Sequence, residues 1–324
     1  MSSFTPLSRL ARDYGYSWDI VYRWVRYFGE KVTTEILVNN ENQSTSVIRV
    51  NSLKWLKTPR KLIDILSKRG FDFTNAQDVS QYTYCLQKDA PFSLGATPEY
   101  LQGLYTPQGL RSQLPVIALA PSKKDLTLDL CAAPGSKTTQ LAQWMHNEGQ
   151  LIAIDRAKTR LLALYENLAR MGVKNCLSLH LDARQIPKLN LKFDKILLDA
   201  PCTGSGIISR DSTRKTSRIL QDILTLSKIQ QQLLSAAIKV LKPGGALVYS
   251  TCSLEPEENE LVIHSVLEKN PDIKIEELSL RHLGTPGLLK IDSTNLDPSL
   301  KNTKRFFPSS GHEGFFICKI KRVL

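Results

Sequence analysis

The sequence predicts an α/β fold, in which a doubly wound, mostly parallel sheet follows a smaller α+β domain. Three observations lead to this prediction. From residue 126 onward, short apolar runs alternate with helical stretches, as in a parallel sheet. The distinctive polar and cysteine residues come directly after those runs. A segment with several prolines and glycines, residues 103–125, separates this part of the chain from a different pattern before it.

The first 115 residues are expected to form the smaller domain. Residues 7–29 and 59–69 have apolar positions at steps of three and four, which predicts helices, and residues 46–51 alternate as a strand does. A basic run here is opposed only by Asp64, so either a positive binding face or an ordinary solvated helix face would explain it. Its members are Lys54, Lys57, Arg60, Lys61, Lys68 and Arg69.

Residues 116–324 are expected to form the larger domain. The predicted strands are 126–130, 150–155, 176–180, 195–200 and 245–251, and the predicted helices are 136–145, 158–172, 217–241 and 257–270. Residues 314–322 look like a strand that returns to the edge of the sheet. Ligands of a parallel sheet bind beyond the carboxyl ends of its strands, so the residues at those ends are the candidates for a site.

Charge and cysteine content limit the function classes. Lys and Arg outnumber Asp and Glu by 43 to 31, a net charge of +12 that is typical of a protein binding polyphosphate, although many basic proteins have no such partner. The six cysteines have no CxxC spacing, so we expect reduced thiols and no metal. No run has the length of a membrane span, and the N-terminus lacks the apolar region of a signal peptide. We expect a soluble, cytoplasmic monomer.

The passage after the first strand, LDLCAAPGSKTT, is rich in small residues, which lets backbone approach a ligand at a helix N-terminus. It matches neither the GxxxxGK[ST] phosphate loop nor the GxGxxG dinucleotide turn. Asp155 ends the second strand, where a carboxylate can accept both ribose hydroxyls; capping of the next helix is the alternative. Asp182, after the third strand, either accepts an adenine amino group or forms a turn.

Two cysteine motifs follow the last two predicted strands of the sheet, DAPCTGSG with Cys202 and STCSLEPEENE with Cys252. Together with CAAPGSKT, IRVN and the terminal RFFP…GFF, they closely resemble the motifs of the Sun/NSUN (RsmB/NOP-type) family of RNA cytosine-5 methyltransferases. The resemblance runs from about Ile48 to the C-terminus. It implies a Rossmann-like class I methyltransferase fold, S-adenosyl-L-methionine as cofactor, RNA as partner and 5-methylcytosine as product. The first domain resembles the RRM-like RNA-binding domain of this family, without aromatic RNP motifs.

The resemblance also implies roles for individual residues. In the family the TC cysteine attacks the base and the PC cysteine assists product release, which maps onto Cys252 and Cys202. Asp199 and Lys137 would also be active-site residues, although a structural ion pair would account for both. Ser136 departs from the family loop, which more often has Gly. The implied cofactor-binding residues are Cys131, Ala132, Ala133, Pro134, Gly135, Ser136, Lys137, Asp155, Arg160, Asp182 and Asp199.

The chemistry of methylation at C5 of cytosine calls for a thiol nucleophile, independently of the family resemblance. C5 of cytosine is a poor nucleophile, and a thiolate that adds at C6 makes C5 enamine-like and able to take a methyl group. Cys131 belongs to the cofactor loop and is not expected to be catalytic. Cys85, Cys176 and Cys318 match no motif and are expected to be small buried residues. The acidic run Pro256, Glu257, Glu258 and Glu260 is explained as the first turn of a helix and receives no catalytic role.

A target base must leave its stack to reach such a pocket. The segment after the PC motif is a candidate phosphate clamp, or else a solvated loop; its basic residues are Arg210, Arg214, Lys215 and Arg218. The compact chain resembles archaeal-type tRNA enzymes, so tRNA is the expected substrate and rRNA the alternative. Two other functions stay open: a non-catalytic RNA-binding or assembly protein on a methyltransferase scaffold, and a methyltransferase acting on a protein or small molecule.

Overall fold

The structure is a computed structural model that describes residues 6–217, 220–278, 280 and 283–323. The chain divides into two compact units, neither of which is one continuous stretch. The first unit consists of Met1–Ser44, Ala200–Leu234 and Ser250–Lys319. The second consists of Thr45–Asp199, Ser235–Tyr249 and Ile320–Leu324. Strand β9 (Leu241–Thr251) and strand β15 (Phe315–Arg322) each have residues in both units.

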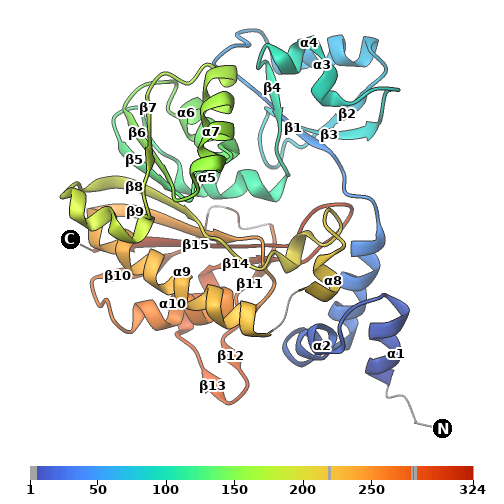
Figure 1. Cartoon of the computed structure of the whole chain (residues 1–324), viewed down its shortest axis with the longest axis vertical. Helices are drawn as coiled ribbons and strands as arrows, with labels where there is room; N and C mark the ends of the chain where they lie inside the picture. The colour runs from blue at the N-terminus through green and yellow to red at the C-terminus, as the bar shows by residue number, and fades with distance from the viewer. Residues whose placement is uncertain (1–5, 218–219, 279, 281–282, 324) are drawn as a thin grey trace. The chain divides into compact units, whose positions relative to one another are not determined.

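The N-terminal part of the second unit is an α+β sheet structure with the chain order β1-α3-β2-β3-α4-β4 (Figure 1). Its strands pair antiparallel in the spatial order β2-β3-β1-β4, which is a ferredoxin-like arrangement. The smaller α+β part of the predicted fold is therefore confirmed. The bounds are Val47–Val50 for β1, Pro59–Lys68 for α3, Asp72–Asn75 for β2, Thr83–Lys88 for β3, Pro98–Leu101 for α4 and Tyr105–Pro107 for β4.

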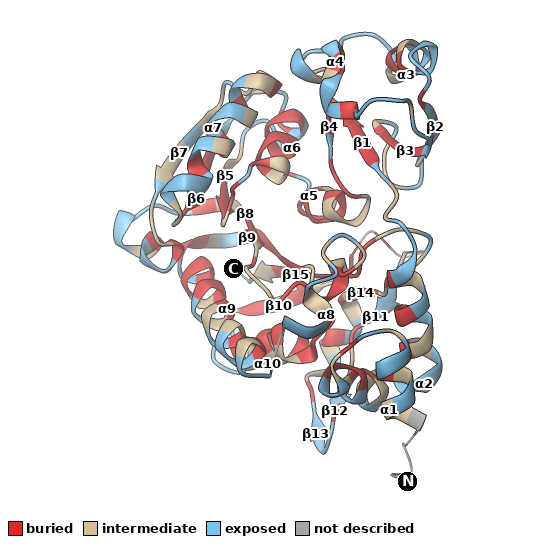
Figure 2. Cartoon of the chain, turned by 45° about the vertical axis from the view of Figure 1, so that its right-hand side comes forward, coloured by how far each residue is buried: buried red, intermediate tan, exposed pale blue. Residues whose placement is uncertain are grey.

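The rest of the second unit contains the predicted parallel sheet. Strands β8, β5, β6 and β7 lie side by side in that order, and each neighbouring pair is parallel. Strand β5 is almost wholly buried (Figure 2), because both faces of a parallel sheet are covered. The bounds are Leu114–Leu119 for α5, Leu126–Leu130 for β5, Ser136–Trp144 for α6, Gln150–Asp155 for β6, Lys158–Met171 for α7, Cys176–His180 for β7 and Phe193–Asp199 for β8. Three predicted strands match β5, β6 and β7 to the residue.

The first unit is built around an apolar cluster on its N-terminal helices. Trp24 and Ile36 of α2 are fully buried against Ile208 and Leu254 from later parts of the chain. Its other elements include a small antiparallel sheet region in which β14 pairs with β15. The bounds are Pro6–Asp13 for α1, Trp18–Glu41 for α2, Arg214–Ser217 for α8, Glu260–Leu267 for α10, Ile273–Glu276 for β10, Thr285–Pro286 for β11, Lys290–Ile291 for β12, Thr294–Asn295 for β13 and Lys304–Phe306 for β14.

Several expectations differ from the structure. The helix predicted for residues 7–29 is two helices, α1 and α2, because Gly15 adopts a left-handed φ of 70° and ends the first one. The last strand was expected at the edge of the sheet, but β14 pairs antiparallel with β15 at Phe306 and Phe315, and β10 pairs with β15 as well. Helix α9 (Leu220–Val240) passes directly into β9, whereas the sequence predicted a helix to residue 241 and a strand that begins only at residue 245. No helix of the described residues is long and apolar enough to cross a membrane.

Candidate functional site

The carboxyl ends of three parallel strands lie level in the second unit. Leu130 of β5 is the register partner of both Ile154 on β6 and Leu198 on β8. The residues that follow them, Cys131, Asp155 and Asp199, therefore leave the sheet at the same edge. This is the arrangement that the parallel-sheet prediction required for a ligand site.

The loop between β5 and α6 approaches its neighbours closely. Gly135 has a left-handed φ of 106°, and a Cβ there would lie 2.8 Å from Cδ1 of Leu164. Cys131 also has a positive φ, of 63°. Helix α7 holds the loop, because Asn167 Nδ2 donates to the carbonyl of Pro134. Gly135 thus permits this close packing, because any side chain there would meet Leu164.

Asp155 is buried and braces this loop. Its Oδ2 accepts from the N–H of Ala133 at 3.1 Å, and its Oδ1 accepts from the N–H of Ala157 at 2.9 Å. The second bond is of the capping kind considered from the sequence, while the first ties strand β6 to the loop. Arg160, the least distinctive candidate in the sequence, also lies here: Nη2 donates to the carbonyl of Ala133, and Nη1 is 3.7 Å from Asp155 Oδ2.

Asp182 behaves as the turn former that was the alternative for it. It accepts from the backbone N–H of Arg184 at 3.0 Å and forms an ion pair with the guanidinium of the same residue. These bonds hold the pKa of Asp182 below its usual range. The role of Asp182 toward an adenine stays a prediction.

Lys137 and Asp199 form the ion pair that was considered as their structural explanation. Lys137 Nζ lies 2.6 Å from Asp199 Oδ2 and also donates to Ser112 Oγ at 3.0 Å. Asp199 is about one third exposed, so its carboxylate remains reachable by a second donor. The pair can hold the carboxylate in place and still accept a hydrogen bond from a ligand.

Asp129 was not selected from the sequence. Its carboxylate lies at the end of β5, where Oδ2 accepts from Thr138 Oγ1 at 2.7 Å and Oδ1 has no hydrogen-bond partner among the described residues. Burial raises the pKa of Asp129 to about 7. The signal for it was a charged residue inside the apolar run LTLDL. Burial also raises the pKa of the Cys131 thiol to about 12, so this thiol stays protonated at neutral pH and is a poor nucleophile.

The two motif cysteines lie in contact in the first unit. The Sγ atoms of Cys202 and Cys252 are 3.3 Å apart. Their segments are joined by backbone hydrogen bonds, from Ala200 N–H to the Ser250 carbonyl and from Gly206 N–H to the Cys252 carbonyl, both at 2.9 Å. A Cβ on Gly206 would lie 2.7 Å from the Cys252 carbonyl oxygen, so any side chain there would push the two segments apart.

A buried carboxylate, that of Glu258, holds both cysteine segments. Glu258 Oε1 accepts from the N–H of Thr203 and from Gln230 Nε2, each at 2.9 Å. Oε2 accepts from the hydroxyls of Thr203 and Ser253. Thr203 follows Cys202 in the chain and Ser253 follows Cys252. The sequence interpretation of Glu258 as an acidic residue of a helix's first turn missed this inward orientation, although a hydroxyl residue after each cysteine was a possible signal.

The basic segment after the PC motif is engaged within the first unit. Arg210 Nη2 lies 3.3 Å from Glu313 Oε2, Arg214 Nε lies 2.8 Å from Asp211 Oδ2, and Lys215 Nζ lies 2.5 Å from Glu41 Oε1. Arg218 lies outside the described residues. A phosphate would have to compete with these carboxylates, so the clamp stays a prediction.

The three cysteines outside the motifs are buried to different degrees. Cys85 and Cys318 are buried and Cys176 is partly buried. The described residues contain no cluster of three His, Cys, Asp or Glu side chains that could hold a metal ion.

A protein-family model described as 16S rRNA methyltransferase RsmB/F matches residues 116–321. The chain is 39% identical over 325 residues to the 28S rRNA (cytosine(4447)-C(5))-methyltransferase of Homo sapiens, covering 98% of this chain and 39% of that protein. It is 40% identical over 232 residues to the tRNA (cytosine(72)-C(5))-methyltransferase of Pyrococcus horikoshii, covering 71% of this chain and 56% of that protein. The chain thus spans well under two thirds of either relative. A crystal structure titled as a methyltransferase homolog protein from Pyrococcus horikoshii has a TM-score of 0.87 and 38% identity, over 99% of this chain and all of that one.

Proposed function

Because the chain belongs to the RsmB/F family of methyltransferases, we propose that it transfers a methyl group from S-adenosyl-L-methionine to C5 of a cytosine in RNA. The observation that carries this proposal is the contact between the thiols of Cys202 and Cys252, each at the position of a family motif. Cytosine-5 methylation in RNA is also the activity named for the human and archaeal relatives. The net charge of +12 favours RNA over a protein or small-molecule substrate.

The residues at the level strand ends fit the proposed cofactor. The loop Cys131–Ser136 presents backbone without bulky side chains, and Asp155 and Asp182 offer carboxylates for the ribose and the adenine amino group. Asp129 has an oxygen that accepts no bond from the described residues, which suits a site that receives a cationic ligand. We include Lys137, Asp199 and Arg160 in this site. When bound, the cofactor supplies a methyl group on a positively charged sulfur.

Cys252 is the proposed nucleophile. Its thiolate adds to C6 of the cytosine, forming an S–C6 bond and moving the ring electrons toward N3 and C5, which makes C5 nucleophilic. C5 would then take the methyl group as the bond from the methyl carbon to the cofactor's sulfur breaks, which leaves a neutral thioether. Loss of the C5 proton to water and cleavage of the S–C6 bond, whose electron pair returns to Cys252 as a thiolate, restore the aromatic ring. Cys202 assists that release. Its Sγ lies 3.3 Å from that of Cys252, close enough to exchange a proton with the departing thiolate.

Asp199 and Lys137 are proposed to hold the base. The carboxylate of Asp199 would accept a hydrogen bond from the exocyclic amine or from protonated N3, which stabilises the charge that thiol addition moves onto the ring. Lys137, 2.6 Å away, keeps that carboxylate oriented. This role needs no rearrangement of the pair, because Asp199 remains partly exposed.

The substrate is proposed to be tRNA, with rRNA as a second candidate. The Pyrococcus horikoshii relative, named for tRNA, supports the first. The human relative, named for 28S rRNA, supports the second, and its alignment covers more of this chain. Residues 1–115 are proposed to bind RNA, with Arg210, Arg214, Lys215 and Arg218 as a phosphate clamp, and residues 116–324 to carry out catalysis. We also propose a monomer acting in the cytoplasm, which light scattering and cell fractionation would test.

Methyl transfer to RNA tests the proposal directly. Purified protein is incubated with methyl-labelled cofactor and unmodified tRNA or rRNA transcripts, and 5-methylcytosine is located by bisulfite sequencing. We expect label in one RNA class and none with Cys252→Ala, while the control Cys176→Ala remains active. Ordinary turnover by Cys252→Ala would show that the nucleophile is wrong. RNA binding without cofactor binding or methylation would instead indicate an assembly protein on a methyltransferase scaffold.

A further inference from the structure

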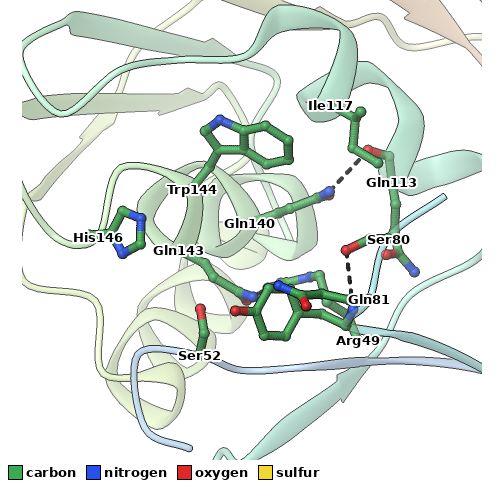
Figure 3. A pocket seen from close by; sticks show the side chains of 11 residues that line it. Arg49, Ser52, Ser80, Gln81, Gln113, Ile117, Gln140, Gln143, Trp144 and His146 are labelled. Carbon is green, nitrogen blue, oxygen red and sulfur yellow. Dashed lines mark hydrogen bonds between the residues drawn. The ribbon is translucent and has the colours of Figure 1, made fainter. Parts of the chain in front are cut away.

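The second unit contains a pocket of about 410 Å³ beside helix α6 (Figure 3), and one of its lining residues, Arg49, donates a hydrogen bond to the carbonyl of Ser136 at the end of the cofactor loop. Trp144 and His146 come from the end of this helix, Arg49 and Ser52 from β1 and the turn after it, and Gln81 and Tyr82 from the segment before β3. In Figure 3, Trp144 and His146 lie on one side of the space, and Arg49 and Gln81 lie on the other. None of the cysteines discussed above lines the pocket.

The pocket wall is cationic and carries no carboxylate. Arg49 is buried, and its guanidinium donates to neutral acceptors, including Gln108 Oε1 at 2.7 Å and Thr139 Oγ1 at 2.9 Å. No Asp or Glu is among the described residues that line the pocket. Burial and the nearby Arg170 lower the pKa of Arg49 to about 9, so it is still charged at neutral pH. The positive charge is therefore not neutralised within the pocket.

Several groups on the wall have no partner among the described residues. The indole of Trp144 is 40% exposed and makes no ring-stacking or cation–π contact with another described residue. The side-chain amide of Gln81 and the hydroxyl of Ser52 make no hydrogen bond with another described residue. A tryptophan normally buries most of its surface, so an exposed indole in a concave, polar pocket marks a place for a flat ligand.

We propose that this pocket binds one unpaired nucleobase of the RNA, at a nucleotide other than the one that is methylated. A base has two flat faces that can stack on Trp144, and an edge of donors and acceptors that can pair with Gln81 and Ser52. The buried positive charge of Arg49 would attract the phosphates of the strand through its electrostatic field, without direct contact. An aliphatic ligand would find little to contact, because Ile117 is the sole aliphatic residue among the described residues of the wall.

The pocket is connected to the proposed cofactor site by a single helix. Eight residue steps of α6 separate Ser136 from Trp144, which is about 12 Å at 1.5 Å per residue. This distance corresponds to a few nucleotides of single strand. A base held at Trp144 would thus fix the register of the strand near the methylation site. The identity of the occupant rests on the proposed function, since it assumes that the protein binds RNA.

Binding of short oligoribonucleotides tests the pocket. Fluorescein-labelled octamers of A, of U and of C are titrated with the full chain, and affinity is read from fluorescence anisotropy. We expect Trp144→Ala to weaken binding of at least one octamer by about fivefold or more, the loss of one stacked base. Trp144→Phe should retain most of the affinity, and Gln81→Ala should change the preference among octamers. Tyr165→Ala is the matched control, because Tyr165 is also an exposed aromatic residue, at 49%, and lies outside both the pocket and residues 1–115.

Assays of methyl transfer distinguish a failure of the pocket assignment from a failure of the proposed function. With full-length RNA, Trp144→Ala should raise KM by about fivefold or more, with kcat and cofactor affinity close to wild type. If the wild type methylates RNA while Trp144→Ala and Gln81→Ala alter neither octamer binding nor KM, the pocket assignment is wrong and the function stands. If no RNA is methylated but Trp144→Ala still weakens octamer binding, the function is wrong and the pocket stands.

Discussion

The substitution Glu258→Gln tests how the two cysteine segments are held. The carboxylate of Glu258 accepts four hydrogen bonds, from the N–H and hydroxyl of Thr203, the hydroxyl of Ser253 and the amide of Gln230. Glutamine has the same shape, but one acceptor oxygen becomes an NH₂ donor. Whichever way the new amide turns, two of the four donors no longer face an acceptor. The hydrogen bonds that hold the Cys202 and Cys252 segments together should therefore weaken, and the substitution creates no cavity.

The size of the effect follows from those two bonds. A hydrogen bond to a charged group contributes about 1.5–3 kcal/mol, so two lost bonds suggest about 3–6 kcal/mol. Two terms reduce this figure: the hydroxyls of Thr203 and Ser253 can rotate to accept from the new NH₂, and burial, which raises the pKa of Glu258, disfavours its charged form. We expect a net loss of about 2–3 kcal/mol in the free energy of unfolding. Because about 1 Å of misplacement can cost roughly 100-fold in rate, kcat should fall by about 10- to 100-fold.

Urea unfolding at pH 7, followed by tryptophan fluorescence, measures the first quantity, and single-turnover methyl transfer measures the second. The control is Glu268→Gln, whose side chain is 64% exposed and, among the described residues, pairs with His264 four residues earlier. That control should stay within about 0.5 kcal/mol of wild type. A Glu258→Gln protein with unchanged stability and unchanged kcat would refute the reasoning. A change in the KM for RNA alone would also refute it, since the carboxylate is proposed to position thiols and not to bind RNA.

Three further predictions use other parts of the structure. Cys202→Ala should accumulate a covalent protein–RNA complex, visible as a band that survives denaturing electrophoresis and is absent when Cys252→Ala is added; no band in either protein would contradict the release role. Since burial raises the folded pKa of Asp129 to about 7, the folded state holds an extra proton between roughly pH 4 and 7, and stability falls as pH rises through that window. Asp129→Asn removes this loss, so its stability relative to wild type should improve by about 3 kcal/mol between pH 4.5 and 7.5 in urea titrations; parallel pH curves would exclude the effect. Arg305→Met leaves Glu260 buried without its cation and should cost about 3–5 kcal/mol, most of which Arg305→Met/Glu260→Met should recover if the pair itself is not a net stabiliser.

The sequence predicted the parallel part of the fold best, because strands buried on both faces leave long apolar runs. Residues 126–130 and 150–155 are such runs, and their limits agree with the structure. The limits of 176–180 agree as well, although this strand is only partly buried. Strands β2 and β4 were not predicted, since DFTN and YTP are short and half polar and become strands through their partners β3 and β1. The split between α1 and α2 depends on the backbone of Gly15, which helical periodicity alone does not reveal.

The candidate site, like the fold, could be predicted from the sequence only in part. The level ends of β5, β6 and β8 could be predicted, because parallel strands bring their carboxyl ends to one edge. Glu258 could not, because two of its partners, Thr203 and Gln230, lie 55 and 28 residues away. Arg49 likewise read as one position of a strand, while the acceptors of its guanidinium on α6 are about 90 residues later. The contacts of a side chain whose partners are distant in the chain can be recognised only from the tertiary structure.

The interleaving of the two units constrains how the protein can be made. Residues near the C-terminus complete both units, since Phe315–Lys319 belong to the first and Ile320–Leu324 to the second. On a ribosome, neither unit can therefore finish folding until residues 315–324 have been synthesised, and many of the contacts that close each unit join distant parts of the chain. The proposed functional boundary at residue 115 also cuts through both units, because residues 1–44 fold with the first and residues 45–115 with the second. Fragments split there should remain aggregation-prone, and chaperone demand during expression should be higher than for a chain of two sequential domains.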